Sequence, residues 1–313
     1  MNHSLSVQVK VPASTANLGP GFDTMGMAFQ LYTTISMQLA ETTQISLSGQ
    51  ELQGLPHDKS NLLYRVAADL FTRAGLPQPE LTIEVSSDIP LTRGLGSSAA
   101  AIVGALVAAN QLAGEPFTTD QLFALATHWE GHPDNVGASL FGGIVVAAMP
   151  EHPDEPVPYL RLPAPPLQVL VTIPDFQLAT AKARSVLPKN YPKSDVIYNI
   201  GRSSLLVAAL AQGRFDLLKK AMRDRIHQPY RAGLVPGLDE ILEAAPDHGA
   251  LGVALSGAGP TILCFYQTEQ EKQQLSSFIA DVMAKREITY RSMSLLPDSS
   301  GVQIDTSLLS AID

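Results

Sequence analysis

Seven prolines stand within the seventeen residues from Pro150 to Pro166, and they constrain the fold more than any other feature of the chain. Proline fixes its backbone φ and has no N–H to donate, so this segment can form neither a long helix nor a central strand. We therefore expect it to connect two domains, with the boundary near residues 155–165. The predicted division is residues 1–158 and residues 159–313.

Strands and helices are expected to interleave on both sides of this segment, without a regular repeat. Apolar runs and alternating patterns predict strands at residues 6–13, 32–40, 43–49, 81–90, 141–149, 167–174 and 288–296, and a strand, a glycine turn and a second strand over residues 249–266. Helical spacing predicts helices at residues 61–75, 98–113, 118–131 and 268–285, and a helical region at about 194–245. The expected class is α+β.

The composition of the chain indicates which kinds of molecule it can bind. The chain has 21 Lys and Arg residues against 30 Asp and Glu, a net charge of −9, which disfavours binding to nucleic acid or to an anionic membrane. The one cysteine, Cys264, cannot form an internal disulfide, and no signal peptide or membrane span is recognisable. We expect a cytoplasmic protein with a small-molecule substrate.

The stretch "RGLGSSAAA" from Arg93 to Ala101 is typical of a phosphate-binding loop. Glycines let the backbone approach a phosphate closely, and the free N–H groups at the start of the following helix hold its charge. Ser97 and Ser98 add hydroxyl groups that could donate to a phosphate or bind magnesium. The alternative is a tight turn, capped by serine, before a buried helix.

Two well-known phosphate loops do not fit this stretch. The Walker string G-x-x-x-x-G-K-[ST] does not occur in the chain. Gly94, Gly96 and Ala99 satisfy a loose G-x-G-x-x-[G/A], but the loop does not directly follow a strand and no acidic residue ends a second strand about twenty residues later. A dinucleotide-binding fold is therefore excluded.

Two further glycine turns follow predicted strands. "VPASTANLGPGFDTMG" contains Asn17 and Asp23, whose side chains could hydrogen-bond a polar ligand, and "LSGAGPT" lies between two strands. An ordinary turn explains either one taken alone. Three such turns in one chain are more than the topology usually requires.

"HWEGHPDN" gathers polar side chains from His128 to Asn135. A zinc protease would need H-E-x-x-H on one helix, but Trp129 occupies the glutamate position and Pro133 is expected to end any helix. A single carboxylate suits Mg²⁺ bound to nucleotide phosphates, so Glu130 is the better candidate. In the second half, Arg184 and Arg231 could each bind a substrate carboxylate through the guanidinium fork, although either alone is more often a surface charge.

Four segments, "VPASTANLGPGFDTMGMAF", "PLTRGLGSSAAAIVGALVAAN", "EGHPDNVGASLFGG" and "ALSGAGPTILCF", resemble in order and spacing the GHMP kinase superfamily, in its homoserine kinase branch. "TAKARSVLP" and "HQPYR" also resemble that branch. The resemblance implies an N-terminal domain like domain 2 of ribosomal protein S5 and a ferredoxin-like C-terminal domain. It implies ATP-dependent phosphorylation of L-homoserine in threonine biosynthesis, with Mg²⁺ as the metal.

The resemblance also implies roles for single residues. Ser98, or less readily Ser97, and Glu130 would hold Mg²⁺, and Asn61 would lie near the adenine. The loop around the ATP phosphates would consist of Pro90, Leu91, Thr92, Arg93, Gly94, Leu95, Gly96, Ser97, Ser98, Ala99 and Ala100. Asn17, Asp23 and Asn135 would surround the amino and hydroxyl groups of homoserine, and Arg184 and Arg231 would take its carboxylate.

The implied catalytic set is Asp23, Ser98, Glu130 and Asn135, although an asparagine cannot act as a base. Asp23 could orient the substrate hydroxyl, while a phosphate oxygen or a water takes the proton. Two alternatives stay open: another acceptor such as mevalonate, a sugar or a different hydroxy amino acid, and a relative that binds nucleotide without catalysis. A homodimer is left open as well.

Overall fold

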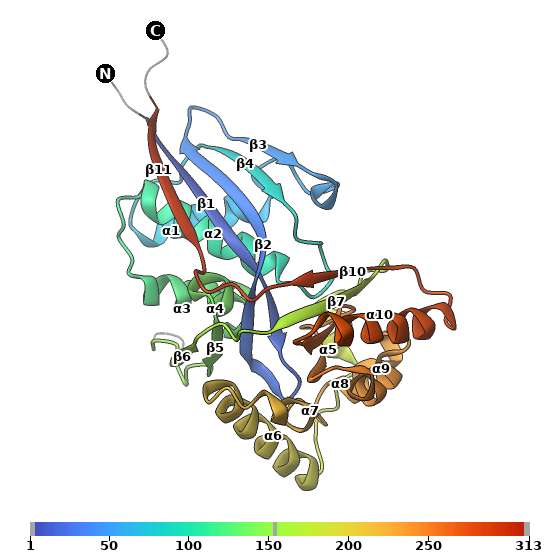
Figure 1. The fold of residues 1–313 in the computed structure, drawn as a ribbon. Helices are drawn as coiled ribbons and strands as arrows, with labels where there is room; N and C mark the ends of the chain where they lie inside the picture. Colours follow the sequence, from blue (N-terminus) through green and yellow to red (C-terminus); the bar gives the residue numbers. More distant parts are fainter. Residues whose placement is uncertain (1–3, 153–154, 310–313) are drawn as a thin grey trace.

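The computed structural model describes residues 4–152 and 155–309, so Pro153 of the proline segment lies outside it. The chain forms two β-sheets (Figure 1). The strands are β1 (Ser4–Asn17), β2 (Gly21–Leu39), β3 (Gln44–Ser48), β4 (Leu81–Ser87), β5 (Ile144–Ala147), β6 (Tyr159–Leu162), β7 (Gln168–Pro174), β8 (Gly252–Leu255), β9 (Ile262–Tyr266), β10 (Tyr290–Leu295) and β11 (Gln303–Leu309). The α-helices are α1 (Leu62–Arg73), α2 (Ser97–Leu112), α3 (Thr119–Glu130), α4 (Pro133–Phe141), α5 (Thr180–Ser185), α6 (Lys193–Ala211), α7 (Leu218–Ala221), α8 (Gln228–Arg231), α9 (Leu238–Ala244) and α10 (Glu269–Ala284), and the 3₁₀ helices are η1 (Gln50–Leu52), η2 (Phe215–Leu217), η3 (Ala232–Leu234) and η4 (Ala245–His248).

The larger sheet has the strand order β11-β1-β2-β4-β3, and β5 and β6 extend it from β2. Helices α1 to α4 cover one face, with α2 packed against β1 and β2 (Figure 1). Because α2 is rich in alanine and buried almost all round, it lies close to the sheet and to its neighbouring helices. No helix within residues 4–152 and 155–309 has the length and apolar character needed to cross a membrane.

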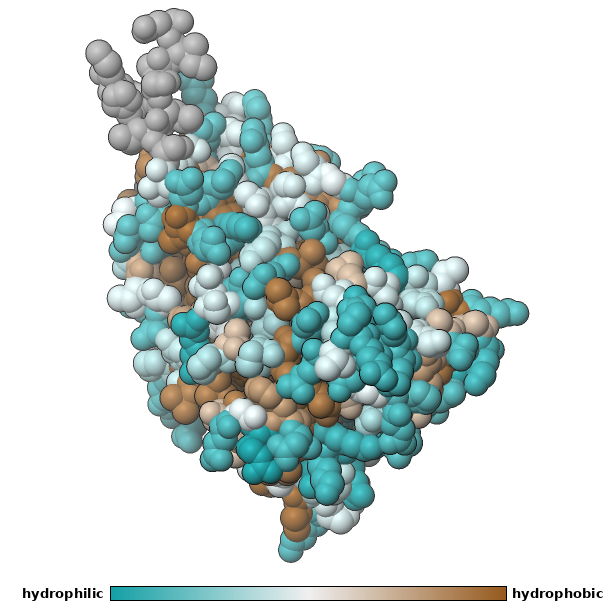
Figure 2. All heavy atoms as spheres, viewed as in Figure 1, coloured by the Kyte–Doolittle hydropathy of each residue, from teal (hydrophilic) through white to brown (hydrophobic). Residues whose placement is uncertain are grey.

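The smaller sheet is antiparallel, with the order β10-β7-β9-β8. Side chains alternate across a strand, so Val169 and Val171 of β7 join the main core while Leu170 joins a second core. The second core is closed by the apolar side of α10, which includes Leu275 and Ile279. The outer side of α10 is hydrophilic (Figure 2). Both faces of this sheet are therefore covered, and the predicted α+β class is confirmed.

The predicted domain boundary does not coincide with a division between the two sheets. The boundary between residues 158 and 159 stays a prediction. In the structure, β6 pairs with β5, and β11 pairs with β1. Both strands come after the boundary and both belong to the larger sheet. The edge position of β6 agrees with the expectation that the proline segment forms no central strand.

The three glycine turns converge where the two sheets meet. They are the turn between β1 and β2, the loop between β4 and α2, and the turn between β8 and β9. The backbone N–H of Gly257 donates to the carbonyl of Ala16 over 3.2 Å, and the hydroxyl of Ser256 lies 2.6 Å from the carbonyl of Gly94. A Cβ on Gly94 would lie 2.3 Å from the carbonyl oxygen of Ser256, so only glycine allows this approach.

We predict that Gly94→Ala destabilises the protein more than Gly114→Ala does. Both glycines have positive φ, +80° and +83°, so alanine costs about 1–2 kcal/mol at either position. Only at Gly94 does the new Cβ meet backbone, which adds about 1–3 kcal/mol for overpacking. Urea unfolding of the two variants measures the difference. Equal losses of unfolding free energy in the two variants would show that the loop of Gly94 does not contact the turn of Ser256 tightly.

Candidate functional site

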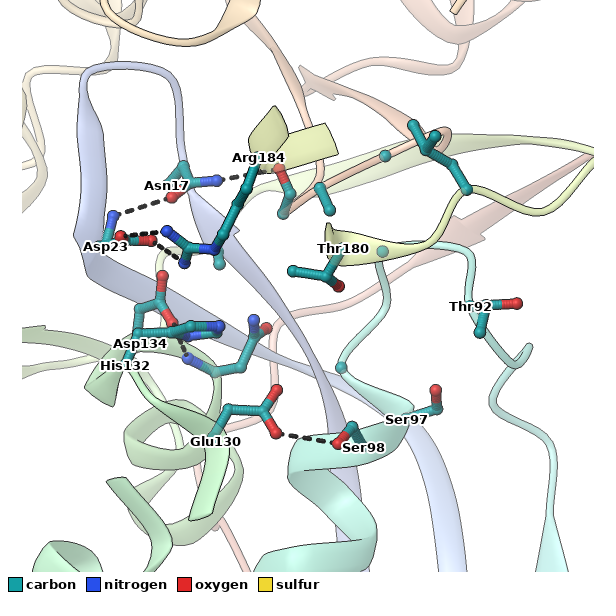
Figure 3. A pocket seen from close by; sticks show the side chains of 18 of the residues that line it. Asn17, Asp23, Thr92, Ser97, Ser98, Glu130, His132, Asp134, Thr180 and Arg184 are labelled. Atoms are coloured by element: carbon teal, nitrogen blue, oxygen red, sulfur yellow. Dashed lines mark hydrogen bonds and ion pairs between the residues drawn. The ribbon is translucent and has the colours of Figure 1, made fainter. Parts of the chain in front are cut away.

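A cavity of about 120 Å³, here the first cavity, lies where the three glycine turns converge. Its lining comes from both halves of the chain, which explains why no single sequence segment contains the whole site. The lining residues are Ala16, Asn17, Asp23, Thr92, Gly94, Gly96, Ser97, Ser98, Glu130, His132, Asp134, Asn135, Leu178, Thr180, Arg184, Arg231, Gly257, Ala258 and Gly259. In Figure 3, Asp23 and Arg184 lie at one end, and Glu130 and Ser98 at the other.

The predicted loop from Pro90 to Ala100 overlaps α2, because the helix begins at Ser97. Gly96 caps the helix in a left-handed conformation, with φ of 69°, and no side chain of the described residues caps the free N–H groups of the first turn. These groups and the helix dipole favour an anion at this end of the cavity.

The loop residues do not all face a cavity. The first cavity is lined by Thr92, Gly94, Gly96, Ser97 and Ser98. Leu91 instead lines a second cavity, described below. Leu95, Ala99 and Ala100 are fully buried in the core. The guanidinium of Arg93 donates to the carbonyls of Asp175 and Phe176, so it fastens the loop to the end of β7.

A second cavity of about 380 Å³ adjoins the first. Its lining is largely apolar, and it shares Thr92, Ser97 and Ser98 with the first cavity. Asn61 lies in its wall as the N-cap of α1, where its Oδ1 accepts from the N–H of Leu63 over 2.9 Å. A ligand with a flat apolar group and an anionic group could occupy this cavity and reach the start of α2.

The side chains of Ser98 and Glu130 meet at the wall of the first cavity. The Ser98 hydroxyl donates to Oε2 of Glu130 over 2.9 Å, although 32 residues separate them in the sequence. Burial raises the pKa of the Glu130 carboxyl, while the nearby His132 charge and the Ser98 hydrogen bond act in the opposite direction. Hydroxyl and carboxylate oxygens are ligands that Mg²⁺ prefers.

At the other end, Arg184 of α5 binds Asp23 through both guanidinium arms. The two N–O distances are 2.9 and 2.8 Å, and the hydrogen bonds with Asp23 raise the pKa of Arg184. Asn17 fixes the turn below them, because its Oδ1 accepts from the N–H of Asp23 over 3.0 Å and its Nδ2 donates to the carbonyl of Gly257 over 2.9 Å.

Arg231 lies deeper, with only 2% of its surface exposed. Its Nε donates to the carbonyl of Ala183 over 3.3 Å, and its Nη1 donates to the carbonyl of Gly257 over 3.0 Å. Burial and the positive charge of Arg184 lower the pKa of Arg231 to about 10, so it is still charged at neutral pH. A buried cation at a cavity wall favours an anionic group of a ligand.

Asn135 is oriented by hydroxyl groups from β1 and α4. Its Oδ1 accepts from the hydroxyl of Ser14 over 3.1 Å, and the Ser14 hydroxyl in turn contacts that of Ser139 over 3.1 Å. The NH₂ group of Asn135 is therefore the end left for a ligand in the cavity.

Several cavity residues were not predicted. His132 and Asp134 belong to the motif that contains Glu130, and their side chains meet with 2.5 Å between Nδ1 and Oδ1. Burial lowers the pKa of His132, but the Asp134 carboxylate outweighs this effect, so its pKa is raised overall. Thr180 begins the segment "TAKARSVLP", from which only Arg184 was singled out, and Leu178 lies just before it. The expectation that Pro133 ends a helix is also corrected, since Pro133 begins α4, where a missing N–H costs no hydrogen bond.

Known proteins match this chain in sequence and in fold. Family models described as GHMP kinases N terminal domain and GHMP kinases C terminal match residues 61–143 and 206–285. A homoserine kinase of Deinococcus radiodurans is 46% identical over 298 residues, which cover 95% of this chain and 96% of the relative. The chain belongs to the homoserine kinase family of GHMP kinases. The predicted family and two-domain GHMP kinase fold are thereby confirmed.

Other members of the homoserine kinase family agree in sequence and in structure. A homoserine kinase of Desulfitobacterium hafniense is 42% identical over 298 residues, covering 95% of this chain and 99% of the relative. The crystal structure of homoserine kinase from Cytophaga hutchinsonii matches with a TM-score of 0.83 and 28% identity, over 96% of this chain and 97% of that one. A mevalonate kinase structure at 16% identity shares the fold, with a TM-score of 0.66 over 94% of this chain and 99% of that one.

We predict that Asp23→Asn lowers the unfolding free energy by no more than about 1 kcal/mol, because the ion pair with Arg184 is partly exposed. Asparagine also tolerates the positive φ of 58° at this position. The contrasting variant is Asn17→Ala, which removes one buried and one partly buried hydrogen bond and should cost about 2–4 kcal/mol. Urea titration of both variants measures these losses. A larger loss for Asp23→Asn than for Asn17→Ala would contradict the described geometry.

Proposed function

We propose that the protein transfers the γ-phosphate of ATP to the side-chain hydroxyl of L-homoserine, giving O-phospho-L-homoserine and ADP, as a step of threonine biosynthesis. Membership of the homoserine kinase family supports this function. The main observation in support of this function is that the two ends of the first cavity suit different ligand groups. Two arginines lie at one end and the free N-terminus of α2 lies at the other, so an amino acid and a phosphate chain can meet between them.

The nucleotide is assigned to the second cavity and the loop. The apolar walls suit an adenine, with Asn61 at the edge, and the shared residues Thr92, Ser97 and Ser98 lead to the start of α2. The loop from Pro90 to Ala100 then surrounds the phosphates through its backbone. The fully buried Leu95 and Ala99 act through backbone N–H groups and through packing. Ala100 acts through packing alone, because its N–H donates to the carbonyl of Gly96 over 2.9 Å.

Ser98 and Glu130 would hold Mg²⁺. This pair includes one carboxylate, that of Glu130, and no group of three or more His, Cys, Asp or Glu side chains suited to a metal occurs in the part of the chain that the structure describes. One carboxylate together with a hydroxyl and nucleotide phosphates suits Mg²⁺, which keeps few protein ligands. When bound, Mg²⁺ would neutralise charge on the phosphates.

Homoserine is a zwitterion, and the first cavity has complementary charges for both of its ends. Arg231 and Arg184 would bind the carboxylate, while Asp23 would bind the ammonium group. Asn17 and the NH₂ group of Asn135 would complete the contacts with the polar groups of the substrate. The substrate must replace the pairing between Arg184 and Asp23 with its own charges.

Transfer of a phosphoryl group requires mainly position and charge stabilisation. The N-terminus of α2 stabilises charge on the transferred group, and Asp23 and Asn135 hold the amino acid so that its hydroxyl faces the phosphate in line. Asn135 cannot accept a proton, so the proton of the hydroxyl passes to a phosphate oxygen or a water. The chain therefore needs no residue acting as a strong base.

A coupled ADP-release assay tests the acceptor. With homoserine, threonine, serine, mevalonate and galactose compared at equal enzyme concentration, we expect kcat/KM to be highest for homoserine by at least about 100-fold, since the other compounds leave charged groups of the site unpaired or misplace the hydroxyl. Turnover of another acceptor without turnover of homoserine would assign a different GHMP kinase activity. ATP binding without turnover of any acceptor would indicate a relative that has lost catalysis.

We predict that Glu130→Gln raises the Mg²⁺ concentration needed for half-maximal activity by about 10–100-fold, because it replaces the carboxylate of the metal site. Ser98→Ala should shift it in the same direction. The matched control is Asp120→Asn, which removes one carboxylate at the opposite end of α3 and should leave the Mg²⁺ requirement unchanged. An equal Mg²⁺ requirement in Glu130→Gln and the control would remove Glu130 from the metal site.

A further inference from the structure

The segment from Asp224 to Arg231, "DRIHQPYR", contributes Arg231 to the wall of the first cavity, and hydrogen bonds fix its backbone. The Asp224 carboxylate accepts from the backbone N–H groups of Ile226, His227 and Gln228 over 3.0, 2.9 and 2.7 Å. The Gln228 side chain accepts from the N–H of Leu255 over 2.7 Å, which ties the segment to β8. The backbone that carries His227 is therefore fixed at the N-terminal end of α8, one turn before Arg231.

His227 is fully buried within this segment, and both ring nitrogens have partners. Nε2 lies 2.7 Å from the carbonyl oxygen of Gly19, and Nδ1 lies 3.1 Å from Nη1 of Arg231. A carbonyl can only accept and a guanidinium can only donate. The ring therefore carries its proton on Nε2, is neutral, and accepts a hydrogen bond from Arg231 at Nδ1.

The surroundings agree with a neutral ring. Burial lowers the pKa of His227, and the positive charge of Arg231 acts in the same direction, against the opposing charge of Asp224. The Phe22 ring stacks on the imidazole with 5.1 Å between centroids, and the guanidinium of Arg231 lies 5.3 Å from the same ring. Phe22 thus limits the movement of both side chains.

The hydrogen bonds of Arg231 leave one nitrogen for a ligand. Nε donates to Ala183, and Nη1 uses its two hydrogens on the carbonyl of Gly257 and on Nδ1 of His227. Nη2 has no hydrogen-bond partner among the described residues, while Arg231 lines the first cavity. Because three N–H groups are fixed in one plane, the orientation of the two remaining N–H groups is fixed too.

We propose that His227 is a positioning residue for the substrate carboxylate: its Nδ1 holds Nη1 of Arg231 so that Nη2 faces the amino acid, and its Nε2–H ties this arrangement to the β1–β2 turn at Gly19. The inference rests on the proposed function, in which Arg231 binds the carboxylate of homoserine. His227 does not touch the substrate and acts through Arg231.

Two amide variants separate the two hydrogen bonds of His227. In His227→Asn, the amide oxygen can take the place of Nδ1 and keep the acceptor for Arg231. In His227→Gln, the amide NH₂ can take the place of Nε2 and keep only the donor to Gly19. We expect His227→Gln to raise the KM for homoserine about 10-fold, with the KM for ATP within about twofold of the wild type. His227→Asn should restore the KM for homoserine to within about threefold of the wild type.

Equal increases in the KM for homoserine in both variants, or a matching increase in the KM for ATP, would overturn the inference in favour of a general packing role. Thermal unfolding of both variants identifies any loss of folding.

A double-mutant cycle separates this inference from the proposed function. Arg231→Lys alone should raise the KM for homoserine, and His227→Gln should add less than about twofold in that background, because both changes remove the same orientation. Full additivity of the two changes would overturn the role of His227 and leave the carboxylate site intact. An unchanged KM in Arg231→Lys would contradict the carboxylate site itself, and the inference with it.

The ring tautomer can be observed in the wild-type protein, which avoids any doubt about folding of a variant. With ¹⁵N-labelled histidine, His227 should give an NMR pattern with a proton on Nε2 and none on Nδ1 at neutral pH, unchanged on addition of ATP. Its signal is assigned by its absence from His227→Asn. A proton on Nδ1 would exclude the hydrogen bond from Arg231 and overturn the inference.

Discussion

The close approach of three backbone turns at the junction of the two sheets determines the rest of the structure. Gly94 packs against the carbonyl of Ser256 from the other half of the chain, and a Cβ on Gly96 would lie 2.1 Å from the hydroxyl of Ser14. Because the contact of Gly94 joins backbone to backbone, it fixes how the loop before α2 faces the second half of the chain. The first cavity is the space that remains between them, and its width depends on the absence of side chains at Gly94 and Gly96.

Charge then divides this space between two kinds of ligand group. The free N–H groups of α2, with Ser98 and Glu130, occupy one end, and Arg184, Arg231 and Asp23 occupy the other. Phosphoryl transfer depends on holding two reactants in line, so a rigid site with separate ends serves it well. The hydrogen bonds of Asn17 supply part of this rigidity. Under the proposed function, the ion pair between Arg184 and Asp23 is exchanged for the charges of the amino acid.

Sequence alone could predict what is decided locally. The glycine turns, the start of the helix predicted at residues 61–75 and the helix predicted at residues 98–113 depend on neighbouring residues, and the structure has these elements. Contacts between distant segments could not be predicted in this way. Strand β11 pairs with β1, although 285 residues lie between Asn17 and Gln303. Thr180 lines the first cavity because of where α5 packs. Pro133 was misread because α3 already ends at Glu130, with Gly131 as its C-cap, and proline at the first position of a helix begins α4. The individual roles of the site residues stay predictions.

A crystal structure of the protein with homoserine and a non-hydrolysable ATP analogue tests the central claim most directly. The account predicts the carboxylate of homoserine on Nη2 of Arg231 and on Arg184, released from Asp23, with the hydroxyl facing the γ-phosphate at the N-terminus of α2. It also predicts the metal between Ser98, Glu130 and the phosphates. Homoserine bound with its carboxylate away from both arginines, or phosphates bound away from the start of α2, would contradict the account.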